Sequence, residues 1–217
     1  MKENKFSVDK YPIILLDFDG VIAESTDIKT EAFKTLFEPF GPEILKKVIS
    51  HHIDHGGISR FKKFQLYYTN YLNRPLSEEE LQEVAKKYSS IVVEKVISAP
   101  LVKGIDTFLE KYYKNKDLYI VSGTPQEELE IIVSKKNLSK YFKGVYGVPH
   151  TKPEIAHMIM KKSGFGGKDL LYIGDSLSDY NNAMDANIEF LGRVMEGETS
   201  RFPEETPIIS DFFDILK

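Results

Sequence analysis

Two aspartates one residue apart, Asp17 and Asp19, follow a short apolar run and are followed by Gly20. Carboxylates this close repel one another, so the pair requires a compensating positive charge. A divalent cation would supply that charge, and oxygen ligands in a chain without cysteine favour Mg²⁺ over zinc. Two aspartates in a turn can also simply cap a helix. The motif is short, so both interpretations stay open on these residues alone.

A second acidic pair, Asp175 and Asp179, follows another apolar run in the segment 174–179. Asp175 would face a metal directly from the end of that run. Asp179 comes four residues later, one helical turn away, where it could bind the metal or support another ligand. The simpler alternative is a loop in which Ser176 or Ser178 caps a helix.

A hydroxyl group, that of Ser122, ends a third apolar run and is followed by Gly123. Thr124 and Glu127 have the spacing of a capping box, with Pro125 at the first helical position. The free amides of such a helix start, together with the Ser122 hydroxyl, would form a seat for an anion. Ordinary capping by Thr124 is compatible with that role.

A lysine, Lys152, precedes Pro153 and Glu154 at the expected start of another helix. The helix dipole disfavours a cation at this position unless an anion lies nearby. Most single lysines are solvated surface residues. A functional role for Lys152 therefore requires that the fold place it beside the acidic pairs.

The elements that position these residues are short apolar runs, which predict buried strands, with helical patterns between them. Alternating strands and helices indicate an α/β fold, a doubly wound parallel sheet covered on both faces. The carboxyl ends of its strands would bring both acidic pairs, the hydroxyl and the lysine to one edge. The expected strands cover residues 13–16, 118–121, 145–146, 170–173, 188–191 and 208–209.

One long segment interrupts this alternation. Between the first two expected strands the apolar residues follow helical spacing, and Ser77 with Glu80 forms a capping box that predicts one helix start. Such an insertion would sit above the carboxyl end of the sheet, where open α/β folds bind ligands, and could act as a lid. We expect an α/β core domain formed by residues 1–24 and 98–217, with an inserted all-helical cap domain over residues 25–97.

The overall composition limits the kinds of ligand. The chain has 217 residues, and its 33 acidic and 29 basic side chains give a net charge of -4. This mildly acidic balance offers no long-range attraction for nucleic acid or anionic lipid, so a bound phosphate must be held by a local site. No apolar run approaches the roughly 20 residues of a membrane span. The absence of cysteine fits a reducing compartment, so we expect a cytoplasmic protein.

The four motifs, in order and spelling, resemble those of the haloacid dehalogenase (HAD) superfamily, in its phosphatase and β-phosphoglucomutase-like branch. The resemblance rests on Asp17 to Val21, Ser122, Lys152 and the segment 174–179, and the helical insertion looks like the type 1 cap of that family. It implies that Asp17 attacks phosphorus to form an aspartyl-phosphate. It further implies that Asp19 protonates the leaving oxygen and then activates water.

The resemblance also implies a ligand set. Mg²⁺ would be held by aspartates of the first and fourth motifs, and the phosphoryl group by Lys152 and by residues of the second motif. The implied metal residues are Asp17, Asp19, Asp175 and Asp179, and the implied phosphate residues are Ser122, Gly123, Thr124 and Lys152. Asp19 acts as an acid near neutral pH only if its pKa is raised, and crowding by Asp17 with closure of the lid would raise it.

Within the expected cap, the segment 56–60 resembles the cap loop of β-phosphoglucomutase-like members, in which an arginine meets the distal, unreacting group of the substrate. Arg60 is therefore a candidate substrate contact, with a solvated arginine as its alternative and Lys63 as a weaker second choice. His51 and His55 are one helical turn apart. No further residue convincingly completes a tetrahedral zinc set, so a fraying helix end is the better interpretation.

The leading hypothesis is a Mg²⁺-dependent phosphatase, a monomer or small homo-oligomer, acting on a small phosphorylated metabolite such as a phosphoglycolate- or sugar-phosphate-like monoester. A sugar phosphomutase of the β-phosphoglucomutase type is the nearest alternative. A signalling receiver domain also combines an acid cluster with a phospho-accepting aspartate, but the chain length, the helical insertion and the spacing of Asp17 and Asp19 oppose it. A catalytically idle binding protein has little support, because every required side chain is present.

Overall fold

A six-stranded parallel sheet forms the centre of the computed structural model, which describes residues 6–56 and 58–216. The strand order is β3-β2-β1-β4-β5-β6, so the chain winds outward from β1 in both directions. Every expected strand is present, and the doubly wound α/β fold is confirmed. The strands are β1 (Ile13–Leu16), β2 (Asp117–Pro125), β3 (Gly144–Val148), β4 (Leu170–Gly174), β5 (Glu189–Arg193) and β6 (Ile208–Ile209).

The register of the three central strands sets the level at which the chain leaves the sheet. Leu16, the last residue of β1, pairs with Ile120 of β2 and with Ile173 of β4. The amide of Asp17 then donates to the Ile173 carbonyl oxygen over 3.0 Å. The loops after β1 and β4 therefore begin side by side at one edge of the sheet.

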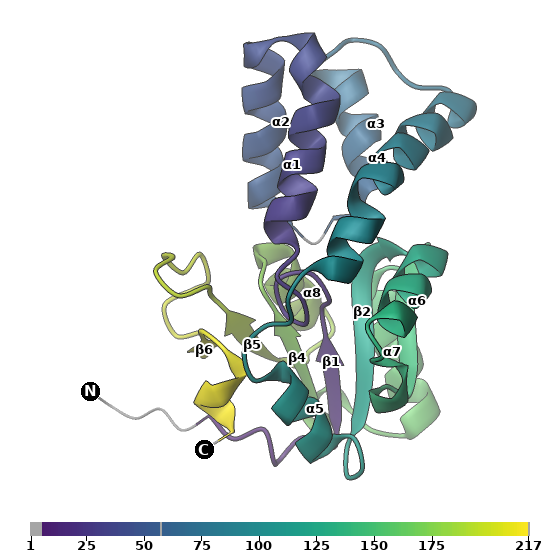
Figure 1. Cartoon of the computed structure of the whole chain (residues 1–217). Helices are drawn as coiled ribbons and strands as arrows, with labels where there is room; N and C mark the ends of the chain where they lie inside the picture. The colour runs from purple at the N-terminus through teal and green to yellow at the C-terminus, as the bar shows by residue number, and fades with distance from the viewer. Residues whose placement is uncertain (1–5, 57, 217) are drawn as a thin grey trace.

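Helices cover both faces of this sheet (Figure 1). Because successive side chains of a strand point to opposite faces, Ile14 and Leu16 belong to one buried cluster and Ile13 and Leu15 to another. The first cluster includes apolar residues of α5 (Ile105–Tyr112) and α6 (Gln126–Lys135). The second includes residues of α7 (Lys152–Ser163) and α8 (Leu177–Asp185).

The first four α-helices after β1, called here the helical unit, rise above the carboxyl end of the sheet (Figure 1). They pack around a cluster of aromatic rings that includes Phe33, Phe64 and Tyr88. Ser77 and Glu80 form the expected capping box, with both reciprocal hydrogen bonds in place. The helices are α1 (Thr26–Phe37), α2 (Pro42–Asp54), α3 (Arg60–Asn70) and α4 (Glu78–Ser98).

One local prediction is wrong. Strand β2 continues through Thr124 to Pro125, and within the described residues α6 begins at Gln126 without a side-chain cap, so Thr124 and Glu127 form no capping box. The extended backbone pairs Pro125 with Val148 of β3. The Thr124 hydroxyl is then free to accept a hydrogen bond from another element.

Short 3-10 helices complete the chain and connect its longer elements. They cover Glu38–Phe40, Ser139–Tyr141, Gly167–Asp169 and Phe212–Ile215. Among the described helices, none combines the length and the apolar composition that a membrane crossing requires.

Candidate active site

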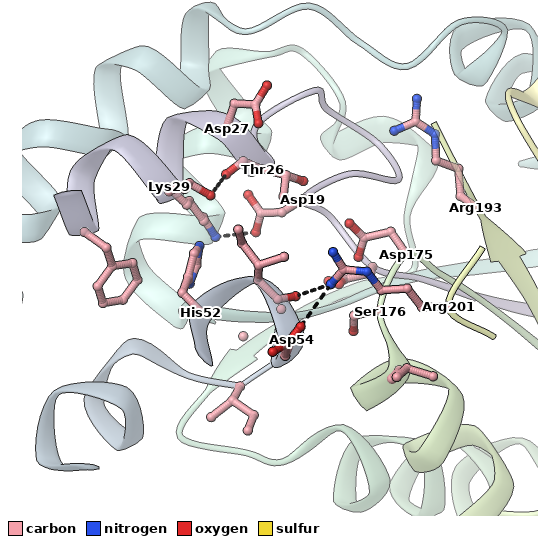
Figure 2. A pocket seen from close by; sticks show the side chains of 18 of the residues that line it. Asp19, Thr26, Asp27, Lys29, His52, Asp54, Asp175, Ser176, Arg193 and Arg201 are labelled. Atoms are coloured by element: carbon pink, nitrogen blue, oxygen red, sulfur yellow. Dashed lines mark hydrogen bonds and ion pairs between the residues drawn. The ribbon is translucent and has the colours of Figure 1, made fainter. Parts of the chain in front are cut away.

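A cavity of about 340 Å³ is lined both by the carboxyl edge of the sheet and by the helical unit. The sheet contributes Asp17, Asp19, Gly123 and Asp175, and residues of α1 to α4 form the opposite wall. Figure 2 shows Asp19 and Asp175 facing Lys29 and His52 of the helical unit. The candidate site therefore lies where the sequence places it.

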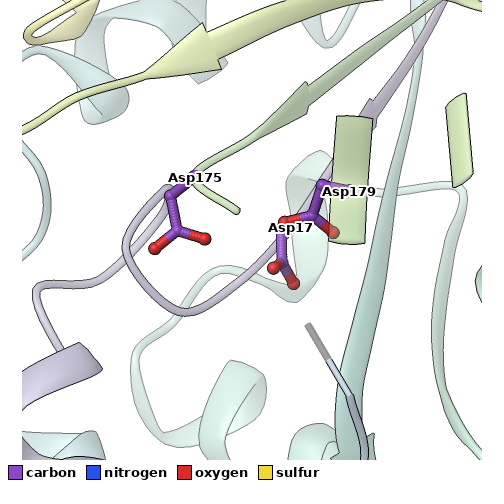
Figure 3. Close-up of side chains that lie close together, drawn as sticks. All are labelled: Asp17, Asp175 and Asp179. Carbon is purple, nitrogen blue, oxygen red and sulfur yellow. The ribbon is translucent and has the colours of Figure 1, made fainter. Parts of the chain in front are cut away.

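Three carboxylates gather at this edge (Figure 3). Asp17, Asp175 and Asp179 each offer an oxygen within 4.8 Å of those of the other two. Glycines make this approach possible: a Cβ on Gly20, which has a φ of +71°, would lie 2.1 Å from Asp175 Oδ2, and one on Gly174 would lie 2.4 Å from the Asp179 Cβ. The two motif glycines thus have a steric reason for being glycine.

Lys152 lies beside two of these acids. Its Nζ is 3.0 Å from Asp17 Oδ2 and 2.5 Å from Asp179 Oδ1, and all three side chains are buried. Although burial alone would lower the pKa of Lys152, the charges of Asp17 and Asp179 raise it well above its usual value. These acids are the anions that a lysine in the first turn of a helix requires.

Asp179 is fully occupied by hydrogen-bond donors. Its Oδ1 accepts from Lys152 and from the Tyr172 hydroxyl, over 2.5 and 3.2 Å. Its Oδ2 accepts from the Ser176 amide and hydroxyl, over 3.2 and 2.7 Å, in the capping box of α8. A carboxylate has about four lone-pair sites, so the geometry makes Asp179 a positioning partner of Lys152.

Asp175 has the opposite environment. Within the described part of the chain no hydrogen-bond donor serves its carboxylate. Burial, followed by the charge of Asp17, raises the pKa of Asp175 well above its usual value. Burial likewise raises the pKa of Asp17 to about 7, although the charge of Lys152 opposes the shift. Excess negative charge on an all-oxygen donor set fits a hard divalent cation such as Mg²⁺.

Asp19 points away from this group and toward α1. Its Oδ1 accepts from the Ser25 hydroxyl over 2.6 Å, and its Oδ2 forms an ion pair with Lys29. Lys29 also donates to the Thr124 hydroxyl over 2.9 Å. Burial alone would raise the pKa of Asp19, but the charge and hydrogen bond of Lys29 lower it instead. The expected raised pKa of Asp19 is therefore wrong for this conformation.

The residues of the second motif lie at the boundary of a second cavity. Ser122 is buried, and its Oγ accepts from the Thr124 amide over 3.1 Å. Ser122 and Lys152 line a second cavity of about 380 Å³, and Gly123 lines both cavities. The second cavity therefore adjoins the first at Gly123, and Lys152 connects it to the acid cluster through its contacts with Asp17 and Asp179.

Arg60 is buried, with 5% of its surface exposed, so the solvated alternative is wrong. Its guanidinium donates to both carboxylate oxygens of Glu128 on α6, over 3.2 and 2.5 Å, and to Ser89 Oγ over 2.7 Å. It also lies 4.7 Å from the centroid of the Tyr88 ring. Arg60 borders the cavity, but these contacts join the helical unit to a helix that covers the sheet. Gly57, also in this loop, lies outside the described residues.

The remaining prediction concerns the histidines. His51 and His55 stack on one another, and His51 Nδ1 lies 3.0 Å from the Tyr67 hydroxyl; among the described residues the acid triad is the group that could hold a metal. Arg201, which the sequence did not single out, donates to the Ile53 carbonyl oxygen over 3.1 Å (Figure 2). No spacing rule links Arg201 to α2 or Lys29 to Asp19, because both contacts are tertiary.

Comparisons with known proteins agree with this geometry. The model of the haloacid dehalogenase-like hydrolase family matches residues 14–193. A phosphoglycolate phosphatase of Pseudomonas savastanoi is 20% identical over 198 residues, covering 81% of this chain. The chain spans 66% of the length of that relative. Phosphoglycolate phosphatase 1 of Pseudomonas aeruginosa is 22% identical over 230 residues, covering 94% of this chain and 78% of the relative.

Solved structures show the same fold. A β-phosphoglucomutase of Clostridium difficile aligns with a TM-score of 0.75 at 18% identity, covering 93% of this chain and 91% of that one. A predicted phosphoglycolate phosphatase of Haemophilus somnus aligns with a TM-score of 0.72 at 18% identity, covering 96% and 97%. With a family match over most of its length and all four motifs at one sheet edge, the chain belongs to the haloacid dehalogenase-like hydrolases.

Proposed function

We propose that this chain is a Mg²⁺-dependent phosphatase that hydrolyses a small phosphorylated metabolite, a phosphoglycolate- or sugar-phosphate-like monoester. The observation that carries the proposal is the position of Asp17, a buried carboxylate that borders the cavity with Lys152 at 3.0 Å and Asp175 beside it. The names of the curated relatives support the same class of reaction.

In the first step an Asp17 oxygen attacks phosphorus while the bond from phosphorus to the ester oxygen breaks. The ion pair with Lys152 favours the ionised form of Asp17, and Asp179 fixes the position of Lys152. Asp17 and Asp175 would hold Mg²⁺, and the charge of that ion would neutralise the phosphoryl oxygens. The Ser122 hydroxyl and nearby amides donate hydrogen bonds to those oxygens, where losing one donor typically costs about 3–4 kcal/mol of barrier.

Proton transfer falls to Asp19 in this proposal. Asp19 gives a proton to the leaving oxygen and then takes one from the water that attacks phosphorus of the aspartyl-phosphate. The ion pair with Lys29 lowers the pKa of Asp19, so Asp19 must leave Lys29 before it can carry that proton. The negative phosphoryl group of a substrate gives Lys29 an alternative partner.

The nucleophile is tested by Asp17→Asn. We expect this variant to lose at least about 10³-fold in phosphate release from p-nitrophenyl phosphate, because the carboxamide cannot form the acyl phosphate. Release of inorganic phosphate is measured with Mg²⁺ for the variant, the wild type and the matched control Asp185→Asn, an exposed aspartate at the end of α8. Activity of Asp17→Asn near that of the control would contradict the assignment.

A sugar phosphomutase is the second candidate, and the ion pair of Asp19 with Lys29 favours it. A low pKa makes a carboxylate a weak base toward water, and a mutase must protect its phosphoenzyme from water. Incubation with sugar phosphates, with isomerised product and free phosphate measured in one sample, separates the two reactions. Turnover of either kind excludes a signalling domain that only accepts phosphate.

A further inference from the structure

Lys63 of α3 is the most deeply buried cation bordering the first cavity, with 2% of its surface exposed. Its Nζ donates to His52 Nδ1 over 2.8 Å and to the His52 carbonyl oxygen over 3.3 Å. An ammonium group has three N–H donors, so these two contacts leave one donor unassigned. The nearest aromatic face is that of Phe33, with its centroid 5.7 Å from Nζ.

The other cations of this cavity wall are paired with carboxylates. Lys29 pairs with Asp19 and Arg60 pairs with Glu128. Arg193 pairs with Glu24, and Arg201 pairs with Asp54. In residues 6–56 and 58–216, Lys63 has no carboxylate within ion-pair distance. A buried ammonium without a counter-ion is costly, and an anion in the cavity would offset that cost.

His52 extends the same wall of the cavity. When Lys63 is an ammonium it can only donate, so His52 Nδ1 is the acceptor and the proton of the neutral ring is on Nε2. Burial, with the charge of Lys63, lowers the pKa of His52 to about 2, so the ring stays neutral. The buried ring borders the cavity, and no described residue accepts a hydrogen bond from its Nε2–H, so this group is free to donate to an acceptor on a ligand.

We propose that Lys63, supported by His52, binds a carboxylate carried by the substrate at the end remote from the phosphate ester. The carboxylate matches the single charge of one ammonium, whereas a second phosphate would bring nearly two charges to it. Arg60, the residue that the sequence favoured for this role, has its guanidinium held by Glu128, Ser89 and Tyr88. The proposal rests on the phosphatase function proposed above and names its substrate class.

The test compares esters that differ only in the remote group. The pairs are 2-phosphoglycolate with ethylene glycol monophosphate, and 3-phosphoglycerate with glycerol 3-phosphate. In each pair the first ester has a carboxylate where the second has a hydroxymethyl group. For at least one pair we expect the wild type to prefer the carboxylate ester by tenfold or more in kcat/KM. Lys63→Met should lower kcat/KM for that carboxylate ester about 10- to 100-fold, which is the effect of losing a charged hydrogen bond. For the hydroxymethyl ester of the same pair, kcat/KM should change less than threefold.

One control and one alternative variant accompany Lys63→Met. Lys47→Met removes an exposed lysine from α2 of the same helical unit and should change neither rate. Lys63→Gln keeps a polar side chain, and it replaces Lys63→Met if the latter does not fold by circular dichroism. Equal rates for both members of both pairs in the wild type, or equal loss for both members in the Lys63 variants, would overturn the proposal. Selective loss in Arg60→Met instead would return the role to Arg60.

A binding arm separates this proposal from the phosphatase function. Calorimetric titration of Asp17→Asn with both members of each pair reports affinity without turnover. We expect tighter binding of the carboxylate ester, and loss of that preference when Lys63→Met is added. This result would support the Lys63 subsite even if the wild type released no phosphate, whereas equal affinities would refute it.

Discussion

The charge of the Lys63 ammonium depends on pH near neutrality. Burial, with the charge of Lys29, lowers its pKa to about 7, although Asp175 and Asp19 across the cavity oppose the shift and His52 beside it stays neutral. Below that pH Lys63 is charged and attracts a carboxylate; above it the free enzyme holds a neutral amine. Recognition of a remote carboxylate should therefore weaken as the pH rises.

This dependence is best measured as a ratio. For the preferred pair of esters, we expect the ratio of kcat/KM values to fall as the pH increases from about 6 to about 9, because kcat/KM reports ionisation of the free enzyme. The two esters share their reacting group, so ionisation of the catalytic acids cancels. Lys63→Arg, whose guanidinium stays charged, should keep the ratio constant. A falling ratio in Lys63→Arg would assign the ionisation to another group.

At this scale, the sequence predicted which acids and which lysine meet, but not their individual partners. Asp17, Lys152 and Asp175 are brought together because strand ends share an edge. The ion pair of Asp19 with Lys29 depends on where α1 passes over that edge, and no local pattern encodes it. The pKa of Asp19 followed from this unpredicted contact.

Among the elements, α3 and α6 are joined by one buried ion pair. Arg60 begins α3 and Glu128 lies in the first turns of α6, with 5% and 21% of their side chains exposed. The contact links two helices that are distant along the chain. It therefore holds the helical unit against the helix that covers the sheet.

Breaking this pair should destabilise the fold. Glu128→Gln leaves a buried guanidinium with a weaker partner, and removing one member of a buried pair costs about 3–5 kcal/mol, less here because Glu128 is partly exposed. At roughly 2–4 °C per kcal/mol we expect Tm to fall by about 5 °C. Thermal unfolding is compared with that of Glu127→Gln, an adjacent exposed position. Equal Tm values for the two variants would show that the ion pair contributes nothing.

The elements themselves were largely predictable, since hydrophobic periodicity determines strands and helices from local sequence. The end of β2 was not, because Thr124 and Pro125 stay extended through pairing with β3, which is a tertiary effect. A capping-box spacing at 124–127 cannot outweigh strand pairing that the local sequence does not show.

For the whole molecule, the acid cluster connects segments that are far apart along the chain. Asp17 follows β1, Lys152 begins α7 and Asp175 follows β4. The sequence predicted that a helical insertion would stand above this cluster. It did not predict that Lys63 rather than Arg60 would border the cavity without a carboxylate partner among the described residues, because that depends on how α3 and α4 rotate against the sheet.

Such a cluster should also make stability depend on Mg²⁺. Repulsion among buried carboxylates opposes folding, and a cation that binds only the folded chain stabilises it by about 2.7 kcal/mol at one hundred times its Kd. For a chain of this size we expect Mg²⁺ to raise Tm by roughly 5–10 °C, reversed by EDTA. Asp175→Asn removes the acid that lacks a hydrogen-bond donor among the described residues, so this variant should be more stable without Mg²⁺ and respond less to it. An equal Tm increase in the variant would place the ion elsewhere, since a cation bound outside the cluster has no reason to depend on Asp175.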